Sequence, residues 1–419
     1  MAEMASAPRH NESYAAAEAV ALRSRARLVA LLAARFRDVE AAEDAMSEAF
    51  ASALSVWPRE GCPANPEAWL LTAARRKLID QIRRHGETAA SDDLENLAGS
   101  ISAASADGLP DRRLALLFAC THPAIDAAIR APLMLQVVLG LEASAIASAF
   151  LTSPAAMAQR LVRAKTKIRD SGIPFVVPER SELPERVEAV LDSIYACFSE
   201  GWTDPAGTDA TRRELAGEAI FLGRLVAELL PEEPEALGLL ALMLYTEARR
   251  SARRTSDGKF VPLAAQDRKL WNESMIDEAE RALRRASAAG VIGRYQLEAA
   301  IQSAHIAGAR TGATPWPAIR DLYDALVTVT GSPVASINRA LAVAEVEGAG
   351  AGLAALEAAA EDPRVHAYQP YWAVRANLLA RAGSYEAARH AYQVAMGLER
   401  DPAVQQYLEQ RCRELGGSC

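Results

Sequence analysis

Residues 65–84, which read NPEAWLLTAARRKLIDQIRR, have the apolar spacing of an amphipathic helix. At about 100° per residue, one stripe is apolar and holds Leu71, Ala74, Leu78 and Ile82. The opposite stripe holds Trp69, Thr72, Arg76, Asp80 and Arg83. A tryptophan that lies among charges indicates one of two things. The helix either presents a nucleic-acid-binding face, or it is an ordinary solvated helix whose tryptophan is covered by a neighbouring loop.

The composition favours helices along the whole chain. Half of the 419 residues are apolar and only 6% are aromatic, Ala and Leu are abundant, and β-branched runs are few. A chain of this length is too long to fold around a single hydrophobic core, so we expect roughly two to four domains. The chain has no apolar run long enough for a membrane span and no signal-peptide core, and its five scattered cysteines form no CxxC pair. These features favour reduced thiols in a cytoplasm.

The net charge of −8 is unevenly distributed. Residues 1–180 hold 21 basic and 21 acidic residues, and residues 181–419 hold the other 25 basic and 33 acidic ones. In the neutral part, positive charge is concentrated in residues 75–84 and 160–169. Such local concentration is typical of a protein that meets nucleic acid with only certain faces. The acidic part is not expected to bind DNA.

Residues 112–171 contain a candidate helix-turn-helix. Its first helix is expected over residues 144–150, and its second begins with Pro154, because proline is tolerated in the first turn. The buried stripe of the second helix is expected to hold Met157, Leu161, Ala164 and Ile168. The outward face is expected to hold Gln159, Arg163 and Thr166, flanked by Arg160 and Lys167. This layout suits a recognition helix, although a basic helix on any globular surface is the alternative.

The C-terminal part reads as repeated helical pairs. Residues 371–398 carry the small and large alternation of a tetratricopeptide hairpin, at Trp372, Ala376, Leu379, Gly383, Tyr385, Ala388, Tyr392 and Ala395. A weaker match lies 34 residues earlier, where Ala342 and Ala354 correspond to Ala376 and Ala388. Because these are packing positions, they predict an α-solenoid and no chemistry.

Several of these motifs together resemble one family. Residues 14–171 resemble the two conserved domains of bacterial extracytoplasmic-function (ECF) sigma factors. Residues 41–50, AAEDAMSEAF, are similar to the stretch of that family that binds core RNA polymerase. Residues 65–84 are similar to its promoter-melting and −10 recognition segment, and residues 157–175 to the −35 reading helix of one subgroup. Members of that subgroup carry a tetratricopeptide-like extension, and residues 229–253 resemble the start of that extension.

The resemblance implies roles for particular residues. Those expected to bind core polymerase are Asp44, Glu48 and Phe50. Those expected to hold a flipped base and the backbone of the melted −10 element are Asn65, Trp69, Thr72, Arg76, Lys77, Asp80, Arg83 and Arg84. Those expected at the −35 element are Gln159, Arg160, Arg163, Thr166 and Lys167. Such a protein changes no covalent bond, so neither an enzyme nor a cofactor or metal is expected.

The predicted architecture is therefore all-α, with two small sigma domains followed by a tetratricopeptide-like solenoid. The expected segments are region 2 over residues 14–86, a flexible linker over 87–111, region 4 over 112–171, a junction over 172–184 and the solenoid over 185–416. The expected partners are core RNA polymerase, promoter DNA and, for the solenoid, its own chain or another protein, with no membrane. Two alternatives stay open. One is a helix-turn-helix regulator with a solenoid sensor, which gives no role to Trp69, and the other is a pure scaffold.

Overall fold

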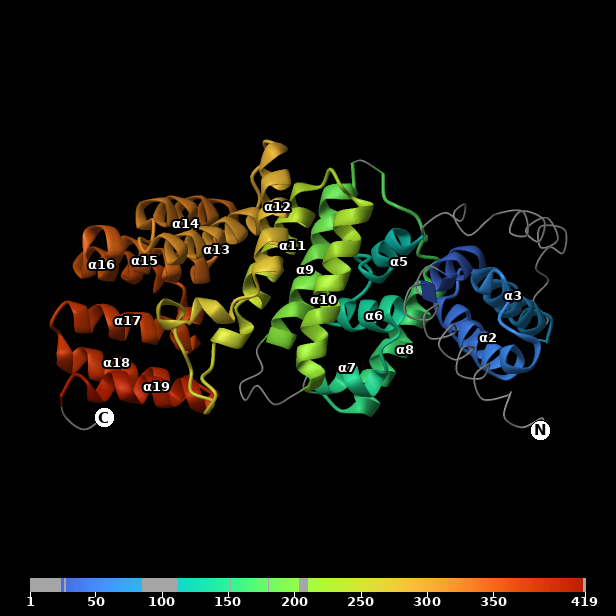
Figure 1. Ribbon diagram of the computed structural model, residues 1–419, viewed down its shortest axis with the longest axis horizontal. Helices are drawn as coiled ribbons and strands as arrows, with labels where there is room; N and C mark the ends of the chain where they lie inside the picture. Colours follow the sequence, from blue (N-terminus) through green and yellow to red (C-terminus); the bar gives the residue numbers. More distant parts are fainter. Residues whose placement is uncertain are drawn as a thin grey trace. The chain divides into compact units, whose positions relative to one another are not determined.

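Helices account for every regular element in the part of the chain that the structure describes, apart from an isolated bridge between Arg254 and Phe260. The structure is a computed structural model that describes residues 24–25, 28–84, 112–150, 152–179, 181–202 and 210–416. It divides into two compact units, residues 1–197 and residues 198–419 (Figure 1). The all-α prediction is confirmed. None of the described helices has the length and apolarity needed to cross a bilayer.

The N-terminal unit consists of two groups of helices. Residues 28–36 are helical and precede the first group, which is α2 (Val39–Glu60) and α3 (Pro66–Arg84). The second group is α5 (Arg113–Cys120), α6 (Ala127–Leu139), α7 (Ala143–Ala149) and α8 (Pro154–Asp170). Helix α9 (Leu183–Trp202) begins in this unit and ends in the next. The predicted linker, residues 87–111, lies outside the described residues.

Helices α2 and α3 pack against each other, and α3 does so with the apolar stripe that the sequence predicts. Leu71, Ala74 and Leu78 of α3 are at most 2% exposed. The main residues that α2 contributes to this core are Ala42, Met46, Ala49, Ala53 and Trp57. Each helix begins at an acidic or amide side chain that accepts from its first turn: Asp38 from the Ala41 N–H and Asn65 from the Ala68 N–H, both at 3.0 Å. One such cap is worth about 1 kcal/mol.

Helices α7 and α8 form the predicted helix-turn-helix. Helix α8 begins after Ser153, whose hydroxyl accepts from the Ala156 N–H at 3.2 Å, and Pro154 occupies its first turn as predicted. Its buried residues are the four predicted ones, Met157, Leu161, Ala164 and Ile168. The helix begins here because the Ser153 hydroxyl accepts from an N–H group of the first turn, and because the fixed φ of Pro154 is already that of a helix. Helix α8 therefore presents its polar side away from the core.

The C-terminal unit is a succession of packed helical pairs. Its helices are α10 (Ala210–Leu229), α11 (Pro234–Glu247), α12 (Glu273–Ala288), α13 (Arg294–Thr311), α14 (Trp316–Thr330), α15 (Pro333–Glu347), α16 (Ala349–Ala359), α17 (Gln369–Arg381), α18 (Tyr385–Leu398) and α19 (Pro402–Arg413). Most neighbours in sequence are also neighbours in space, from α10–α11 to α18–α19. This local packing is typical of a solenoid.

Helices α11 and α13 approach each other closely because glycines, which have no side chain, lie at their contact. A Cβ on Gly238 would lie 2.7 Å from the Gln296 nitrogen, and one on Gly293 would overlap the Glu235 carboxyl group. The Glu235 carboxylate accepts from the Tyr295 and Gln296 N–H groups at 2.9 and 3.1 Å. A side chain of α11 thus satisfies free donors at the start of α13, where negative charge is also favoured.

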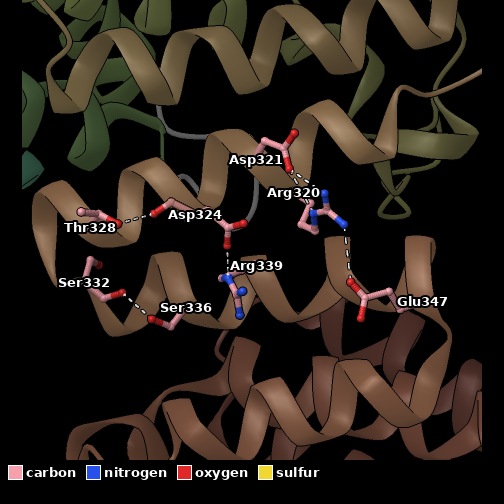
Figure 2. A network of polar contacts seen from close by, with 8 residues as sticks. All are labelled: Arg320, Asp321, Asp324, Thr328, Ser332, Ser336, Arg339 and Glu347. Atoms are coloured by element: carbon pink, nitrogen blue, oxygen red, sulfur yellow. Dashed lines mark hydrogen bonds and ion pairs between the residues drawn. The ribbon is translucent and has the colours of Figure 1, made fainter.

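Polar contacts join α14 to α15 on their exposed sides, as Figure 2 shows. Arg339 donates to Asp324, and Arg320 pairs with Asp321 at 2.8 Å and with Glu347 at 3.5 Å. Exposed pairs of this kind are worth about 0–1 kcal/mol each. They therefore help to set the register of the two helices, while the apolar contacts beneath them supply most of the stability.

The structure differs from several sequence expectations. The two compact units divide at Cys197/Phe198, inside α9, whereas the sequence suggested a junction over residues 172–184. Tyr385, expected as a packing residue, is 52% exposed. Ala354 is also exposed, because α16 turns Gly352 and Leu356 inward instead. Cys62, Cys120 and Cys197 form no disulfide, but Cys412 is disulfide-bonded, which corrects the expectation of reduced thiols throughout.

Candidate nucleic-acid interface

Helix α3 carries Trp69 at the border between the core and the surface. The Trp69 ring is half-buried and meets the buried Trp57 ring edge to face, with centroids 5.5 Å apart and planes at 70°. Asn65 holds the start of this helix, since its carbonyl also accepts from the Trp69 N–H at 3.2 Å. Part of the Trp69 ring is therefore covered by its own domain, and the rest is available at the surface.

The remaining predicted residues of α3 extend along its exposed side. Thr72, Arg76, Lys77 and Asp80 are all exposed. The Thr72 hydroxyl donates to the Ala68 carbonyl at 2.7 Å, so its oxygen retains the capacity to accept. Arg83 and Arg84 lie on α3, but their side chains are outside the described part of the structure. The exposed side of α3 thus combines cations, a hydroxyl and an aromatic edge.

The predicted polymerase-binding residues lie on α2. Asp44 and Glu48 are one turn apart and exposed, whereas Phe50 is half-buried. Glu48 forms an ion pair with Lys77 of α3 at 2.9 Å, with side chains 60% and 47% exposed. The structure thereby joins one residue predicted for polymerase and one predicted for DNA in a single exposed pair, which salt screens readily.

The polar residues of α8 lie on three sides of the helix. Gln159 and Arg163 are exposed on the side opposite the core, and Thr166 beside them is half-buried. Arg160 and Lys167 are exposed on one flank. The other flank carries Lys165 and Arg169, which the sequence prediction did not include. The central face of α8 thus carries uncharged polar side chains and an arginine, and both flanks carry cations. This is the arrangement of a recognition helix that lies between two phosphate backbones.

A pocket of about 470 Å³ opens beside the Arg160 flank. It is lined on one side by Arg160, Arg163 and Lys167 and on the other by the start of α6, around Asp126. The Asp126 carboxylate accepts from the Ala128 N–H at 3.0 Å, so this acid is engaged as a helix cap. Three predicted −35 residues are therefore brought together at one opening on the surface.

The opposite flank of α8 is occupied by α2. Lys165 forms an ion pair with Glu43 at 3.0 Å, and each side chain is only 10% exposed. Burial raises the pKa of the Glu43 carboxyl above its ordinary value, and the positive charges of Lys165 and Arg25 oppose this rise. Removing one partner of such a pair would leave a buried, uncompensated charge.

Two further contacts join the same helical groups. Arg169 of α8 lies 3.6 Å from the Asp38 carboxylate, at the start of α2. The Arg25 guanidinium lies where a Cβ on Gly140, at the end of α6, would be. The sequence did offer a signal for Glu43, because it is a charge on the buried stripe of α2, next to Ala42 and Met46. No local pattern indicates its partner, which is 122 residues away.

Among the described residues, no group of three or more His, Cys, Asp or Glu side chains is arranged to hold a metal ion. Cys120 and His122, which stand close together in the sequence, serve other purposes. Cys120 is fully buried, and the His122 ring accepts from the Ala124 N–H at 3.1 Å.

Comparison with known proteins identifies two segments. Residues 21–88 match the family model of sigma-70 region 2. Residues 186–287 match the model of a family of unknown function, DUF6596. The first match contains α2 and α3 and supports a sigma-factor-like, non-enzymatic role in transcription initiation. The second spans most of α9 through most of α12, within the segment that the sequence assigned to the solenoid.

One relative matches over nearly its whole length. An uncharacterized protein of Rhizobium meliloti (strain 1021), R00370, is 39% identical over 387 residues, which cover 91% of each chain. No solved structure matches the chain. The similarity is therefore not confined to either of the two matched segments.

Proposed function

We propose a role as an ECF-type sigma factor for this chain, which belongs to the same protein family as the Rhizobium meliloti relative and carries a sigma-70 region 2 domain. In this role the chain binds core RNA polymerase and directs it to promoters through two DNA elements. The observation that carries the proposal is the region 2 match over α2 and α3, joined in one chain to a helix-turn-helix with an exposed polar reading face.

The −10 element is assigned to α3 and the loop before it. An unstacked base can stack on the uncovered part of Trp69, which is worth on the order of 1–3 kcal/mol. Thr72 and Asn65 supply hydroxyl and amide groups near the start of the helix, and Arg76, Lys77, Arg83 and Arg84 supply charge for phosphates. Asp80 lies among these cations and limits the net charge. The half-buried ring supports this assignment, since Trp57 holds it in one orientation.

The −35 element is assigned to α8. Gln159, Arg163 and Thr166 face the bases, while Arg160 and Lys167 bind the backbone. The exposure of four of these five residues is consistent with the assignment. Core polymerase is assigned to the exposed side of α2, where Asp44 and Glu48 present negative charge and Phe50 an apolar edge.

The C-terminal unit is proposed to regulate the sigma domains in cis, in place of a separate anti-sigma protein. Residues 198–419 hold 24 basic and 29 acidic residues and so carry −5 of the net charge of −8. A unit covalently joined to its target also acts at high effective concentration. Its stacked helical pairs form the kind of surface that binds a helix or an extended peptide. Transcription by a chain that lacks the C-terminal unit would show whether this unit activates or inhibits the sigma domains.

Reconstituted transcription tests the proposal directly. The full chain should co-elute with core RNA polymerase on gel filtration, and the complex should initiate at discrete sites on genomic DNA that core enzyme alone does not use. A chain that binds duplex DNA as a dimer but never co-elutes with polymerase would instead be a helix-turn-helix regulator with a solenoid sensor. A chain that does neither would be a scaffold.

A further inference from the structure

An arginine cluster lies in the C-terminal unit, where α11 ends and the segment toward α12 begins. Its members are Arg249, Arg250, Arg253 and Arg254. Arg250 and Arg253 both lie over the ring of Trp202, with guanidinium carbons 4.8 and 4.3 Å from the ring centroid. Attraction between each cation and the indole ring therefore holds two like charges close together.

Two of the four arginines are neutralised by carboxylates. Arg250 pairs with Glu247 at 2.7 Å, and Arg254 pairs with Asp401, at the start of α19. The other two arginines form no ion pair with any residue that the structure describes. Four positive and two negative charges leave the cluster at +2, although the unit as a whole carries −5.

The two arginines without a carboxylate are also withdrawn from water. Arg249 is 9% exposed and donates to the Tyr245 carbonyl at 3.2 Å and to the Gln302 side chain. Burial and the nearby Arg253 charge lower the pKa of Arg249 to about 10. Arg253 is half-buried, and its pKa is lowered by burial and by the other arginines. Because a buried cation without a counter-charge is costly, an anion that binds here would be stabilising.

We propose that the arginine cluster is a binding site for the phosphate group of a small molecule, which Arg253 contacts directly. The guanidinium of Arg253 makes no hydrogen bond to any described residue, so its N–H donors are open to a ligand. A guanidinium can bind phosphate through two parallel hydrogen bonds. At pH 7 a phosphate monoester carries about −1.5 to −2 charge, which matches the unbalanced +2, whereas one carboxylate supplies only half as much.

Titration calorimetry on the full chain, without polymerase or DNA, tests the site independently of the proposed function. The probes are inorganic phosphate, glycerol 3-phosphate and succinate at constant ionic strength. We expect both phosphates to bind and succinate to bind more weakly. Tighter binding of glycerol 3-phosphate would identify a phosphorylated metabolite as the ligand, and equal binding would identify free phosphate. Absence of saturable phosphate binding, or succinate binding of equal affinity, would overturn the proposal.

Arg253→Gln tests the residue itself, because it removes one charge and leaves the two carboxylate pairs in place. Phosphate should bind this variant about ten- to a hundredfold more weakly, which is the effect of losing hydrogen bonds to a charged group. Arg284→Gln is the matched control, since it removes the same charge from the same unit at a side chain that is 76% exposed. Equal phosphate affinities of Arg253→Gln and the wild type would overturn the site.

Urea unfolding separates a ligand site from a packing role of Arg253 on Trp202. Without phosphate, the midpoint of Arg253→Gln should equal or exceed that of the wild type, because the substitution relieves repulsion by Arg250 and Arg254. Saturating phosphate should raise the midpoint of the wild type and of Arg284→Gln, but not that of Arg253→Gln. If Arg253→Gln lowered the midpoint and kept the full response to phosphate, Arg253 would be a packing residue and the proposal would fail.

Discussion

Trp69 meets the buried Trp57 edge to face, with ring centroids 5.5 Å apart. The contact holds the Trp69 ring without burying it completely, so the ring has one side in the domain and another at the surface. Such a pair contributes about 0.5–1.5 kcal/mol beyond the area that it buries. Trp69 is therefore expected to serve both the stability of α2 and α3 and the binding of an unstacked base.

Trp69→Ala should impair promoter opening more than duplex binding, because base stacking matters only after the strands separate. Permanganate footprinting of the melted region measures the opening, and a urea unfolding curve measures the accompanying loss of stability. Trp69→Phe should retain most of both. Unchanged opening in a folded Trp69→Ala protein would reduce Trp69 to a packing residue.

Arg163→Ala should lower affinity for the −35 element and relax its sequence preference, by about 1–3 kcal/mol if the guanidinium contacts a guanine with two hydrogen bonds. Lys167→Ala, on the flank of the same helix, should weaken binding to every sequence alike and reduce the salt slope by about one. Binding to matched and mismatched duplexes at several salt concentrations separates the two effects. If Arg163→Ala lost the same affinity for every duplex, Arg163 would be assigned to a phosphate instead of a base.

Asp44→Arg should weaken association with core polymerase, since it reverses an exposed charge on the face of α2 that is proposed to meet a basic surface. Glu60→Arg is the control, because it makes the same charge change at the exposed end of α2. A pull-down with core enzyme measures both. Retention of Asp44→Arg at the wild-type level would contradict the assignment of this face.

Removal of the C-terminal unit should change promoter-specific transcription several-fold while leaving polymerase binding intact. The cut belongs after residue 202, because the first part of α9 packs with the N-terminal unit. Arg186 donates to the Phe118 carbonyl and lies 5.9 Å from its ring, and Val190 and Ile194 are buried. Multiple-round transcription by residues 1–202 and by the full chain gives the sign of regulation. Identical rates in all conditions would make the C-terminal unit a passive appendage.

The C-terminal unit should lose stability as the pH falls from about 6.5 to about 4. Burial, with a smaller contribution from Arg249, lowers the pKa of His305 to about 4. The unfolded chain therefore takes up a proton in this window that the folded unit does not, and the folded unit loses at most about 3 kcal/mol. Urea midpoints at pH 7.5 and 4.5 should converge in His305→Gln but not in the exposed control His390→Gln. A pH response that His305→Gln leaves intact would assign it to other groups.

Much of the helical framework can be predicted from the sequence alone. The stripes of α3 and α8 and the start of α8 at Pro154 follow from local spacing, because a helix repeats every 3.6 residues and its caps are read within one turn. The hairpin of α17 and α18 follows for the same reason, with Ala376, Ala388 and Ala395 completely buried. Exposure of Arg163 and Lys167 also follows, since they lie opposite a stripe of four apolar residues.

Only the tertiary structure determines what each helical face meets. The sequence places Trp69 among charges but does not reveal the Trp57 ring beside it, and it assigns α9 wholly to the C-terminal domain although its first part packs with the other unit. The pairing of Glu43 with Lys165, 122 residues apart, is likewise absent from any local pattern. Periodicity records which side of a helix is buried, because that depends on neighbours one turn away. The partner across the interface depends on how distant segments pack, and in this unit that packing covers one flank of the reading helix.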